Sequence, residues 1–332
     1  MCVSRLIPAM VVLALAPGLA RGSGGAGTTG AASLKVAAGA RPAALGGAFV
    51  GLADDVNALF WNPAGLAGVD ARQLGLMYTS YLVDTSYQLV SWAQPMPALG
   101  GGIAVAAYTL DYGKLTLRDE RADGLYGPAT GTTAPREWYL TAGWGRPLPA
   151  VAGLGRLKAG ASVKLTFQPA TLGEVVGAGV SAGALLDTPV EGLRAGLVAD
   201  NLGALTSGGP ALPINFRFGA SYARPVGGRL SAVAAADARY FLDTGFRACG
   251  GLEVVAFDLL AVRGGWQSGG TDGAVTGASG AAVSGEGGPT LGFGVRSPAS
   301  WGGRRVRFSL DYALSAVGDL GNAHRVQLTV RL

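Results

Sequence analysis

A regular alternation of apolar and polar side chains constrains the fold of this 332-residue chain more than any other feature. From Arg325 to Leu332 every even position is apolar and every odd position is polar. The same pattern recurs in four further segments: 157–167, 214–222, 230–240 and 305–314. A period of two is typical of a β-strand with one apolar and one polar face. The chain is therefore predicted to be all-β.

Turn clusters such as Pro225–Gly228 and Leu242–Gly245 separate the alternating segments. Most of the segments are close to the roughly 9–11 residues that a tilted strand needs to cross a bilayer. We predict about fourteen strands: 72–80, 85–94, 101–110, 137–147, 157–168, 175–187, 192–201, 214–225, 229–240, 245–256, 258–267, 289–297, 304–314 and 322–332. The links 111–136 and 268–288 are long and carry no clear element.

The composition excludes several classes of protein. Hydrophobic residues make up 49% and charged residues 14%, which excludes a disordered chain. The formal charge of +5 is small and scattered, so no nucleic acid partner is expected. One histidine, His324, and two cysteines, Cys2 and Cys249, offer little for metal binding or histidine-based catalysis. We therefore predict no catalytic residue, no metal, no cofactor and no enzymatic activity.

Residues 1–22 have the pattern of a secretory signal peptide. Arg5 precedes an apolar run from Leu6 to Leu15, and small residues follow it. Cleavage after Ala20 and cleavage after Gly22 both fit. The apolar run is shorter than the roughly 20 residues of a transmembrane helix. The mature chain is therefore predicted to be exported.

Two architectures share the alternating pattern: a soluble sandwich or solenoid with its apolar faces inward, and an outer-membrane barrel with its apolar faces outward. Short turns alternating with long links favour the barrel. Closure also leaves no strand edge unpaired in lipid. Residues 71–332 are therefore predicted to form a transmembrane antiparallel up-and-down β-barrel of about 14 strands, in the outer membrane of a Gram-negative-type bacterium and in contact with its lipid.

Aromatic residues near the predicted strand ends leave two readings open, because they fit interfacial girdles and a packed core equally well. These residues are Tyr78, Tyr81, Trp92, Trp138, Tyr139, Tyr240 and Trp266. The last strand carries its apolar face to the chain terminus, which is typical of a C-terminal signal for the outer-membrane assembly machinery. That predicted signal consists of Val326, Leu328, Val330 and Leu332.

Residues 23–70 do not alternate and are predicted to form a linker and a short helical plug. Apolar residues from Leu45 to Leu59 recur at helical spacing, and Asn62–Gly65 is a turn before the first strand. The acidic pair Asp54 and Asp55 has two readings: one of them caps a helix that begins near Val56, or the pair serves as paired carboxylates or binds a cation. A plug of this size could lie in the lumen of a barrel.

One motif suggests an esterase but has the wrong context. Gly179–Gly183 matches the G-x-S-x-G pattern, which requires a strand, a sharp turn and a helix. Alternation continues straight through this segment. Ser181 is therefore predicted to be a small residue that faces the lumen.

In an ordered set of motifs, the chain resembles the PorV/PorQ family of outer-membrane proteins, which is related to FadL. The matching residues are Leu34–Val36, Gly39–Arg41, Leu45–Phe49, Asp54, Asp55, Trp61, Asn62, Pro63, Ala64, Gly65, Leu66, Asp200–Gly203, Leu212, Pro213, Asp311–Leu314 and His324–Val326. They span nearly all of the mature chain, and within the plug we take Asp54, Asp55, Trp61, Asn62, Pro63 and Gly65 as the family motif.

The resemblance implies a fourteen-stranded barrel with an N-terminal plug and two alternative functions. PorV-like members handle cargo at a type IX secretion machine, so protein secretion or assembly at the outer membrane is the main prediction, with secretion-system subunits or cargo proteins as partners. FadL-like relatives pass hydrophobic molecules, so the alternative is a channel for a hydrophobic solute. In that case Phe49, Phe60 and Trp61 are expected to line the path of the solute.

Overall fold

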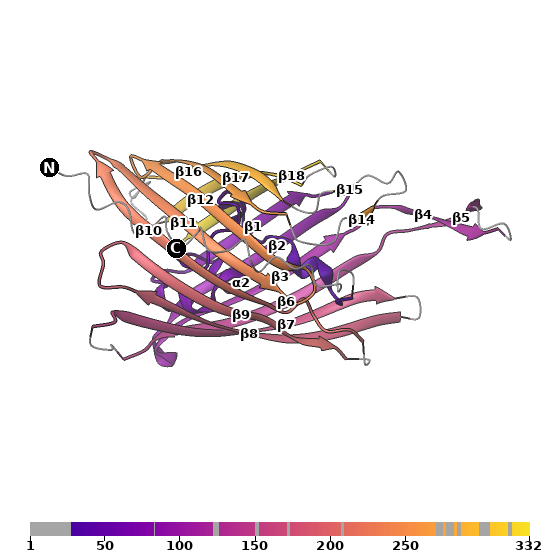
Figure 1. The fold of residues 1–332 in the computed structure, drawn as a ribbon, viewed down its shortest axis with the longest axis horizontal. Helices are drawn as coiled ribbons and strands as arrows, with labels where there is room; N and C mark the ends of the chain where they lie inside the picture. Colours follow the sequence, from indigo (N-terminus) through magenta and orange to yellow (C-terminus); the bar gives the residue numbers. More distant parts are fainter. Residues whose placement is uncertain are drawn as a thin grey trace.

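The computed structural model describes residues 28–82, 84–121, 126–149, 153–170, 173–206, 209–269, 275–276, 282–283, 287–298, 306–317 and 321–332. Fourteen of its strands form a closed barrel in the order β1-β18-β17-β16-β13-β12-β11-β10-β9-β8-β7-β6-β3-β2 (Figure 1). Neighbouring strands are antiparallel, and β1 closes the barrel against β18. The predicted all-β up-and-down barrel is therefore confirmed.

The barrel strands lie close to their predicted bounds. They are β1 (Gln73–Ser80), β2 (Ser86–Met96), β3 (Gly101–Asp111), β6 (Arg136–Pro147), β7 (Arg156–Ala170), β8 (Gly173–Asp187), β9 (Leu193–Leu205), β10 (Asn215–Gly227), β11 (Leu230–Phe241), β12 (Gly245–Ala256), β13 (Leu260–Gln267), β16 (Gly288–Arg296), β17 (Arg307–Ala316) and β18 (Asn322–Arg331). The largest difference is at the end of β9, which continues beyond residue 201 through an irregularity in its pairing with β8.

The expectation of featureless links at 111–136 and 268–288 was wrong. The first link forms a hairpin of β4 (Leu115–Glu120) and β5 (Tyr126–Thr133), which projects beyond the barrel in Figure 1. The second contains a short pair of strands, β14 (Val275–Thr276) and β15 (Ala282–Val283). A hairpin that continues from two paired strands needs no buried face, so its sequence need not alternate.

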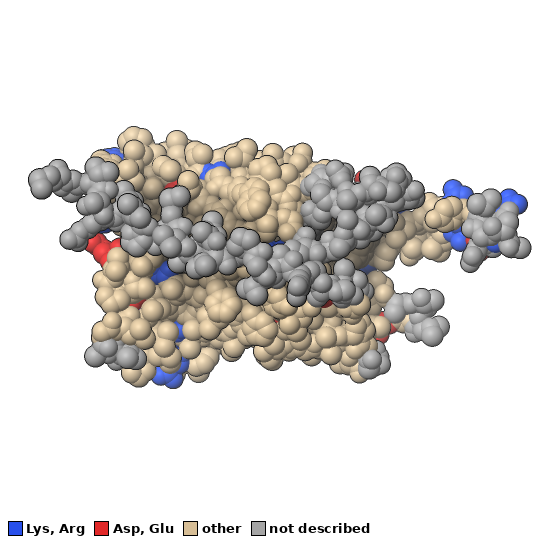
Figure 2. All heavy atoms as spheres, viewed as in Figure 1, with Lys and Arg blue, Asp and Glu red and all other residues tan. Residues whose placement is uncertain are grey.

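The wall carries apolar side chains outside and polar side chains inside. On β1, Leu76 and Tyr78 are exposed whereas Met77 and Thr79 are buried. On the face in Figure 2, the middle of the wall is mostly uncharged. This distribution is the reverse of a soluble protein's and matches a barrel that faces lipid. No helix among the described residues is long and apolar enough to cross a membrane.

The two readings of the aromatic residues each hold for part of the set. Tyr78, Trp138, Tyr240 and Trp266 are exposed on the outer wall, where they fit interfacial girdles. Tyr139 is fully buried in the lumen. Strand position alone did not separate them because a shift of one residue along a strand reverses the face of the side chain.

The two ends of the barrel differ in their links. At the end where β1 begins and β18 finishes, most links are short, such as 97–100, 228–229 and 257–259, and the longest is 297–306; we call it the short-turn end. The opposite end, called the loop end, carries the β4–β5 hairpin and the link 206–214.

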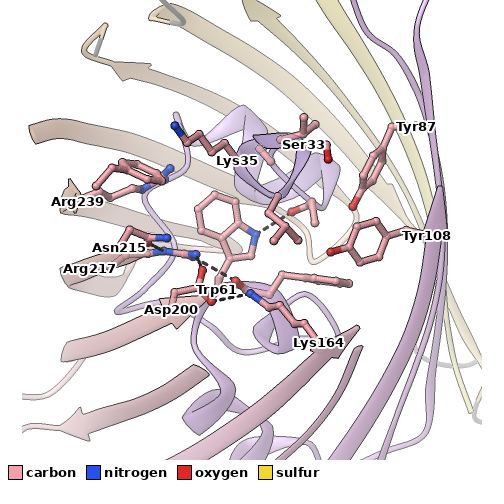
Figure 3. Close-up of a pocket in the computed structure, with 16 residues that line it drawn as sticks. Ser33, Lys35, Trp61, Tyr87, Tyr108, Lys164, Asp200, Asn215, Arg217 and Arg239 are labelled. Atoms are coloured by element: carbon pink, nitrogen blue, oxygen red, sulfur yellow. Dashed lines mark hydrogen bonds and ion pairs between the residues drawn. The ribbon is translucent and has the colours of Figure 1, made fainter. Parts of the chain in front are cut away.

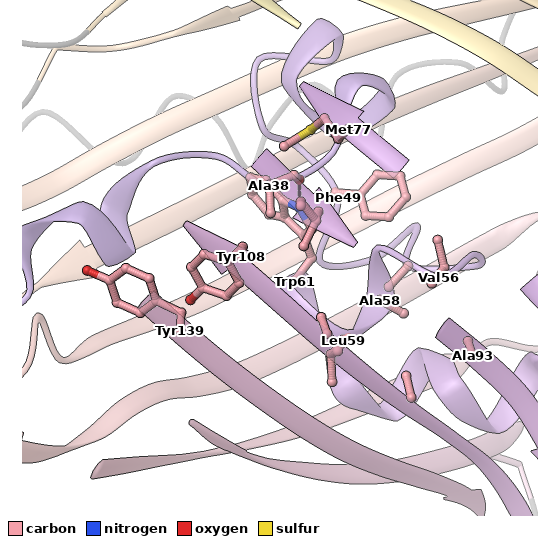
Figure 4. Close-up of a cluster of buried hydrophobic side chains, with 14 of the residues drawn as sticks. Ala38, Phe49, Val56, Ala58, Leu59, Trp61, Met77, Ala93, Tyr108 and Tyr139 are labelled. Atoms are coloured by element: carbon pink, nitrogen blue, oxygen red, sulfur yellow. Dashed lines mark hydrogen bonds between the residues drawn. The ribbon is translucent and has the colours of Figure 1, made fainter. Parts of the chain in front are cut away.

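The N-terminal segment forms the predicted helical plug inside the barrel. Its elements are η2 (Ala32–Lys35), α1 (Ala40–Ala44), α2 (Ala58–Trp61) and η3 (Pro63–Gly68). Phe49, Leu59 and Trp61 of the plug join Tyr108 and Tyr139 of the wall in one buried cluster (Figure 4). The hydrophobic core of this protein therefore lies in the lumen, between plug and wall.

Candidate functional site

The helix η3 of the plug rests on a row of glycines. The row crosses four adjacent strands, and each member pairs with the next: Gly102, Gly145, Gly160 and Gly183. A Cβ atom on any of them would lie closer than 3.0 Å to an atom of the plug, such as the backbone of Pro63 or Leu66. Since only glycine permits such an approach of two backbones, this row fixes where η3 lies.

Polar side chains of the wall satisfy the irregular backbone of the plug. The carboxylate of Asp237 accepts hydrogen bonds from the backbone N–H groups of Phe49 (2.8 Å) and Val50 (3.0 Å). Gln327 accepts one from the N–H of Ala40 at 2.9 Å, and Gln73 accepts one from Val56 at 3.0 Å. A buried N–H without a partner would cost about 1–3 kcal/mol, so the polar inner face stabilises the plug in the lumen.

An ion-pair network joins α1 to the wall. Both Nε and Nη2 of Arg41 donate to the carboxylate of Glu253, each at 2.9 Å. Glu253 also accepts from Arg263 at 2.6 Å, and Arg263 reaches Asp311 at 2.7 Å. Bidentate pairs of this kind are among the stronger polar contacts in proteins. The network therefore ties the plug to β12, β13 and β17.

The acidic pair of the plug belongs to the same network. Nη1 of Arg41 lies 2.5 Å from Asp54 and 3.2 Å from Asp55. Burial alone would lower the pKa of Arg41, but Asp54 and Glu253 raise it above its ordinary value. Burial raises the pKa of the Asp55 carboxyl, as does the charge of Asp54, and Arg41 opposes the rise. The two carboxylates are thus ion-pair partners of one arginine.

The helix predicted to begin near Val56 begins two residues later, and Asp55 makes a cap-like contact just before it. The helix α2 begins at Ala58, and its N-cap residue Asn57 makes no side-chain cap hydrogen bond. Asp55 instead accepts from the N–H of Asn57 at 2.8 Å, which stabilises the turn before the helix. Among the described residues, no group of three or more His, Cys, Asp or Glu side chains is arranged to hold a metal ion.

Aromatic rings from plug and wall meet at the loop-end side of the plug. Tyr108 stacks on Tyr139 with ring centroids 4.6 Å apart, and Phe60 packs edge-on against Tyr108 at 5.7 Å. Tyr87 lies 5.3 Å from Tyr108. Phe60, Tyr87 and Tyr108 line a cavity of about 40 Å³, which we call the loop-end cavity (Figure 3). The three tyrosines are almost fully buried against one another, so only a small part of this aromatic cluster borders the cavity.

Charged side chains line the other side of the loop-end cavity. Asp200 accepts from Lys164 at 2.6 Å and also pairs with Arg217. The guanidinium groups of Arg217 and Arg239 lie 5.6 and 4.7 Å from the ring centroid of Trp61. Figure 3 shows the indole between these cations and the tyrosines. The cavity thus has an aromatic side and a cationic side.

The three residues predicted to line a solute path have different positions. Phe60 and Trp61 line the loop-end cavity. Phe49 packs edge-on against Trp61 at 6.3 Å but is fully buried and lines neither of the two cavities described here. The sequence reasoning missed Tyr87 and Tyr108, although the period of β2 and β3 turns both toward the lumen.

The remaining motif residues of the plug build its structure. The side chain of Asn62 caps η3 by accepting from the N–H of Ala64 at 3.1 Å, and it donates to Val50 and Ala184 at 3.0 Å. Pro63 occupies the first position of η3, which suits its fixed φ. Gly65 contacts the backbone of Ala53 so closely that a Cβ atom would overlap it.

Two further sequence predictions concern the wall. Ser181 faces the lumen as predicted and donates to Asp200 at 2.5 Å, whereas His324 contacts Tyr312 at 2.8 Å near the outer surface. They form no catalytic pair. The predicted assembly signal of Val326, Leu328, Val330 and Leu332 lies at the end of the chain with Val326 and Leu332 exposed. Its recognition by the assembly machinery stays a prediction.

A second, larger cavity lies on the short-turn side of the plug. It measures about 820 Å³, and residues of the plug and of β11–β13 and β16–β18 line it. We call it the short-turn cavity. It shares no lining residue with the loop-end cavity. Residues of the plug line both cavities, so the plug lies between them.

Comparisons with known proteins support the fold. The model of an uncharacterised protein family (UPF0164) matches residues 10–139. No curated protein matches the chain. The toluene transporter TodX of Pseudomonas putida has 12% identity and a TM-score of 0.53, over 87% of this chain and 95% of TodX. The toluene transporter TbuX of Ralstonia pickettii has 12% identity and a TM-score of 0.51, over 88% of this chain and 97% of TbuX.

The similarity to TodX and TbuX is one of fold alone at this level of identity. A FadL homologue of Pseudomonas aeruginosa is also similar, with 13% identity and a TM-score of 0.47 over 94% of this chain and 98% of that protein. The predicted barrel fold is shared with the two toluene transporters, whereas the specific resemblance to PorV/PorQ is not confirmed.

Proposed function

We propose that this protein is an outer-membrane channel that admits small hydrophobic molecules, which was the alternative prediction from the sequence. The observation that carries the proposal is the loop-end cavity, where rings of the plug and of the wall converge around one space. The apolar outer wall fits a location in the outer membrane. The shared fold with two toluene transporters adds support.

The geometry suggests how such a solute is captured. An apolar molecule that leaves water gains free energy in proportion to the apolar area it buries. Phe60, Tyr108 and Trp61 line the loop-end cavity, but its volume of about 40 Å³ is too small for a molecule such as toluene, so capture requires these side chains to move apart. Since the plug lies between the two cavities, passage to the short-turn end requires the plug to shift. Capture and passage are therefore separate steps.

The main sequence prediction, cargo handling in protein secretion, has no support from the fold or the comparisons. It stays a prediction, as do secretion-system partners. Deletion of the gene separates the two functions, because a secretion factor would leave cargo in the periplasm. Export of all cargo at the normal level, together with slower uptake of a hydrophobic compound, is the outcome that the channel proposal requires.

The predicted signal peptide, residues 1–22, lies outside the described residues. We propose that it directs export and is removed near residues 20–22. Fractionation of cells followed by N-terminal sequencing of the protein from the outer membrane tests both points. An intact N-terminus beginning at Met1 would contradict the removal.

A substitution in the loop-end cavity tests the channel function. We expect Phe60→Ala to weaken equilibrium binding of radiolabelled toluene to the purified protein about fivefold, since an aromatic contact contributes about 1 kcal/mol beyond its buried area. Phe218→Ala is the matched control because Phe218 lies on the outer wall with 57% of its surface exposed. Absence of saturable toluene binding in the wild type, or equal losses in both variants, would contradict the proposal for this class of solute.

A further inference from the structure

The short-turn cavity contains an unusual number of arginines. Its charged lining residues include Arg41 and Arg263 deep in the lumen, and Arg296, Arg307 and Arg331 near the rim. Arginine pairs with carboxylates and phosphates in a planar, bidentate geometry and stays charged at all ordinary pH values. The question is therefore which of these cations already have an anionic partner in the protein.

The deep arginines are neutralised by the plug and the wall. Glu253 lies between Arg41 and Arg263, and Asp311 completes the pairing of Arg263. Asp54 and Asp55 pair with Arg41 from the side of the plug. The acidic groups that face the deep part of the cavity are therefore already engaged.

The rim arginines are arranged differently. Arg307 on β17 stands directly opposite Arg331 on β18. Arg296 on β16 stands opposite Ser309, two residues from Arg307 along the same inward face of β17. Three arginines on three adjacent strands thus face one side of the cavity. We call Arg296, Arg307 and Arg331 the arginine triplet.

Only Arg331 of the triplet makes an ion pair with a described residue, whereas Arg296 lies within electrostatic reach of Glu253 and Asp311 in the deep network. Arg331 pairs with Asp70, which is itself exposed. Within the described residues, Arg296 and Arg307 make no ion pair and no side-chain hydrogen bond. The neighbouring turns β10–β11 and β12–β13 contribute both signs of charge, Arg229 and Asp258, and Asp258 precedes Leu259, whose carbonyl accepts from the N–H of Arg296. Like charges directly opposite one another destabilise a pair of strands, so this side of the cavity is built to favour an anion.

We propose that the arginine triplet binds a carboxylate or phosphate group at the short-turn end of the lumen. The site goes beyond the proposed uptake function and does not depend on it. Arg296 and Arg307 supply free guanidinium donors, and Arg331 adds positive charge beside them. The cavity of about 820 Å³ has room for the rest of a small molecule.

Two sources share this chemistry: a free small anion and the phosphodiester of a lipid headgroup that enters from the rim. They differ in what accompanies the charge. A free anion needs only the inward-facing donors, whereas a headgroup must also bring acyl chains past the rim. Titration with inorganic phosphate, and separately with a soluble short-chain phosphatidylglycerol, distinguishes them.

The experiment is isothermal titration calorimetry of the full protein in a non-ionic detergent at low salt. We expect saturable binding of inorganic phosphate, weakened about tenfold by Arg307→Gln and lost in Arg296→Gln/Arg307→Gln, because each substitution removes a charge-assisted contact. Arg224→Gln is the control, since Arg224 is exposed near the same end of β10 and bonds Tyr222. Stronger binding of phosphatidylglycerol than of phosphate would assign the site to a headgroup.

Thermal unfolding distinguishes anion binding by the triplet from a purely structural role. Phosphate should raise the Tm of the wild type and leave that of the double variant unchanged, because a ligand stabilises only the state that binds it. Without phosphate, Arg307→Gln should raise the Tm, since it removes one of two opposed charges. Absence of saturable binding of both probes by the wild type, or an equal loss in Arg224→Gln, would overturn the proposal.

Discussion

Among the places where the wall holds the plug, two differ most clearly in their chemistry. Under η3, four paired glycines allow backbone to approach backbone, and no residue of η3 carries a charge. Beside α1, Arg41 connects to Glu253 and Arg263 at the edge of the short-turn cavity. We call these the glycine seat and the ionic seat.

The two seats differ in what can weaken them, and this predicts which side of the plug detaches from the wall first. The glycine seat depends on shape, and neither salt nor pH alters the fit of two backbones. The ionic seat depends on charges that border a cavity large enough for water, so its strength varies with ionic strength and protonation. Displacement of the plug is therefore expected to begin at the ionic seat, with the glycine seat as the fixed side.

Glu253→Gln should have the largest effect on this comparison. Glu253 is 2% exposed and pairs with both Arg41 and Arg263, so its loss leaves two buried guanidinium groups without their shared partner. Breaking a buried ion pair costs about 3–5 kcal/mol. We expect the free energy of unfolding in a denaturant titration to fall by about that amount.

A labelling experiment shows whether Glu253→Gln also releases the plug. Cys249 is a buried thiol on β12 that packs against Ala48 of the plug. Labelling by a maleimide should become faster in Glu253→Gln while the β-sheet circular dichroism is retained. Glu174→Gln at the far end of β8 serves as the control, because Glu174 is exposed. Equal labelling rates in Glu253→Gln and the wild type would show that the ionic seat does not hold the plug.

Gly160→Ala should have the next largest effect and a different signature. The added Cβ would overlap the backbone of Pro63, and neither backbone can move away cheaply. Overpacking of this kind costs about 1–3 kcal/mol. Gly264→Ala is the matched control, because its Cβ would meet only Leu291 at 3.8 Å. Thermal unfolding measures the Tm of both variants. An equal decrease in Tm for Gly160→Ala and Gly264→Ala, or a decrease for Gly160→Ala that depends on salt concentration, would contradict the glycine seat.

Much of the fold could be predicted because alternation with a period of two identifies each strand and also the face on which each of its residues lies. The lumen position of Ser181 followed from that period alone. The two seats could not be predicted, because the glycine seat depends on register between strands and the ionic seat on how the plug docks against the wall. Gly145 and Gly160 meet only once β6 and β7 are aligned, and Arg41 contacts Glu253 across 212 positions of the chain. A single sequence does not specify such pairings.

The smallest expected effect concerns pH at the ionic seat. Burial and Asp54 raise the pKa of Asp55, so the folded protein binds a proton there at a higher pH than the unfolded chain does. The contribution of Asp55 to stability is then largest below its ordinary pKa of about 3.9 and is lost as the pH rises through the raised value. Asp55→Asn removes this dependence.

Measurement of Tm at pH 7 and pH 4.5 tests the assignment. The wild type should gain relative to Asp55→Asn on acidification, because only the wild type gains a proton at this site. Gly160→Ala should show the pH dependence of the wild type, since the glycine seat contains no titrating group. If the Tm difference between the wild type and Asp55→Asn is constant, or changes in the opposite direction, protonation of Asp55 does not act on the ionic seat. Its coupling to Arg41 would then be structural and independent of pH.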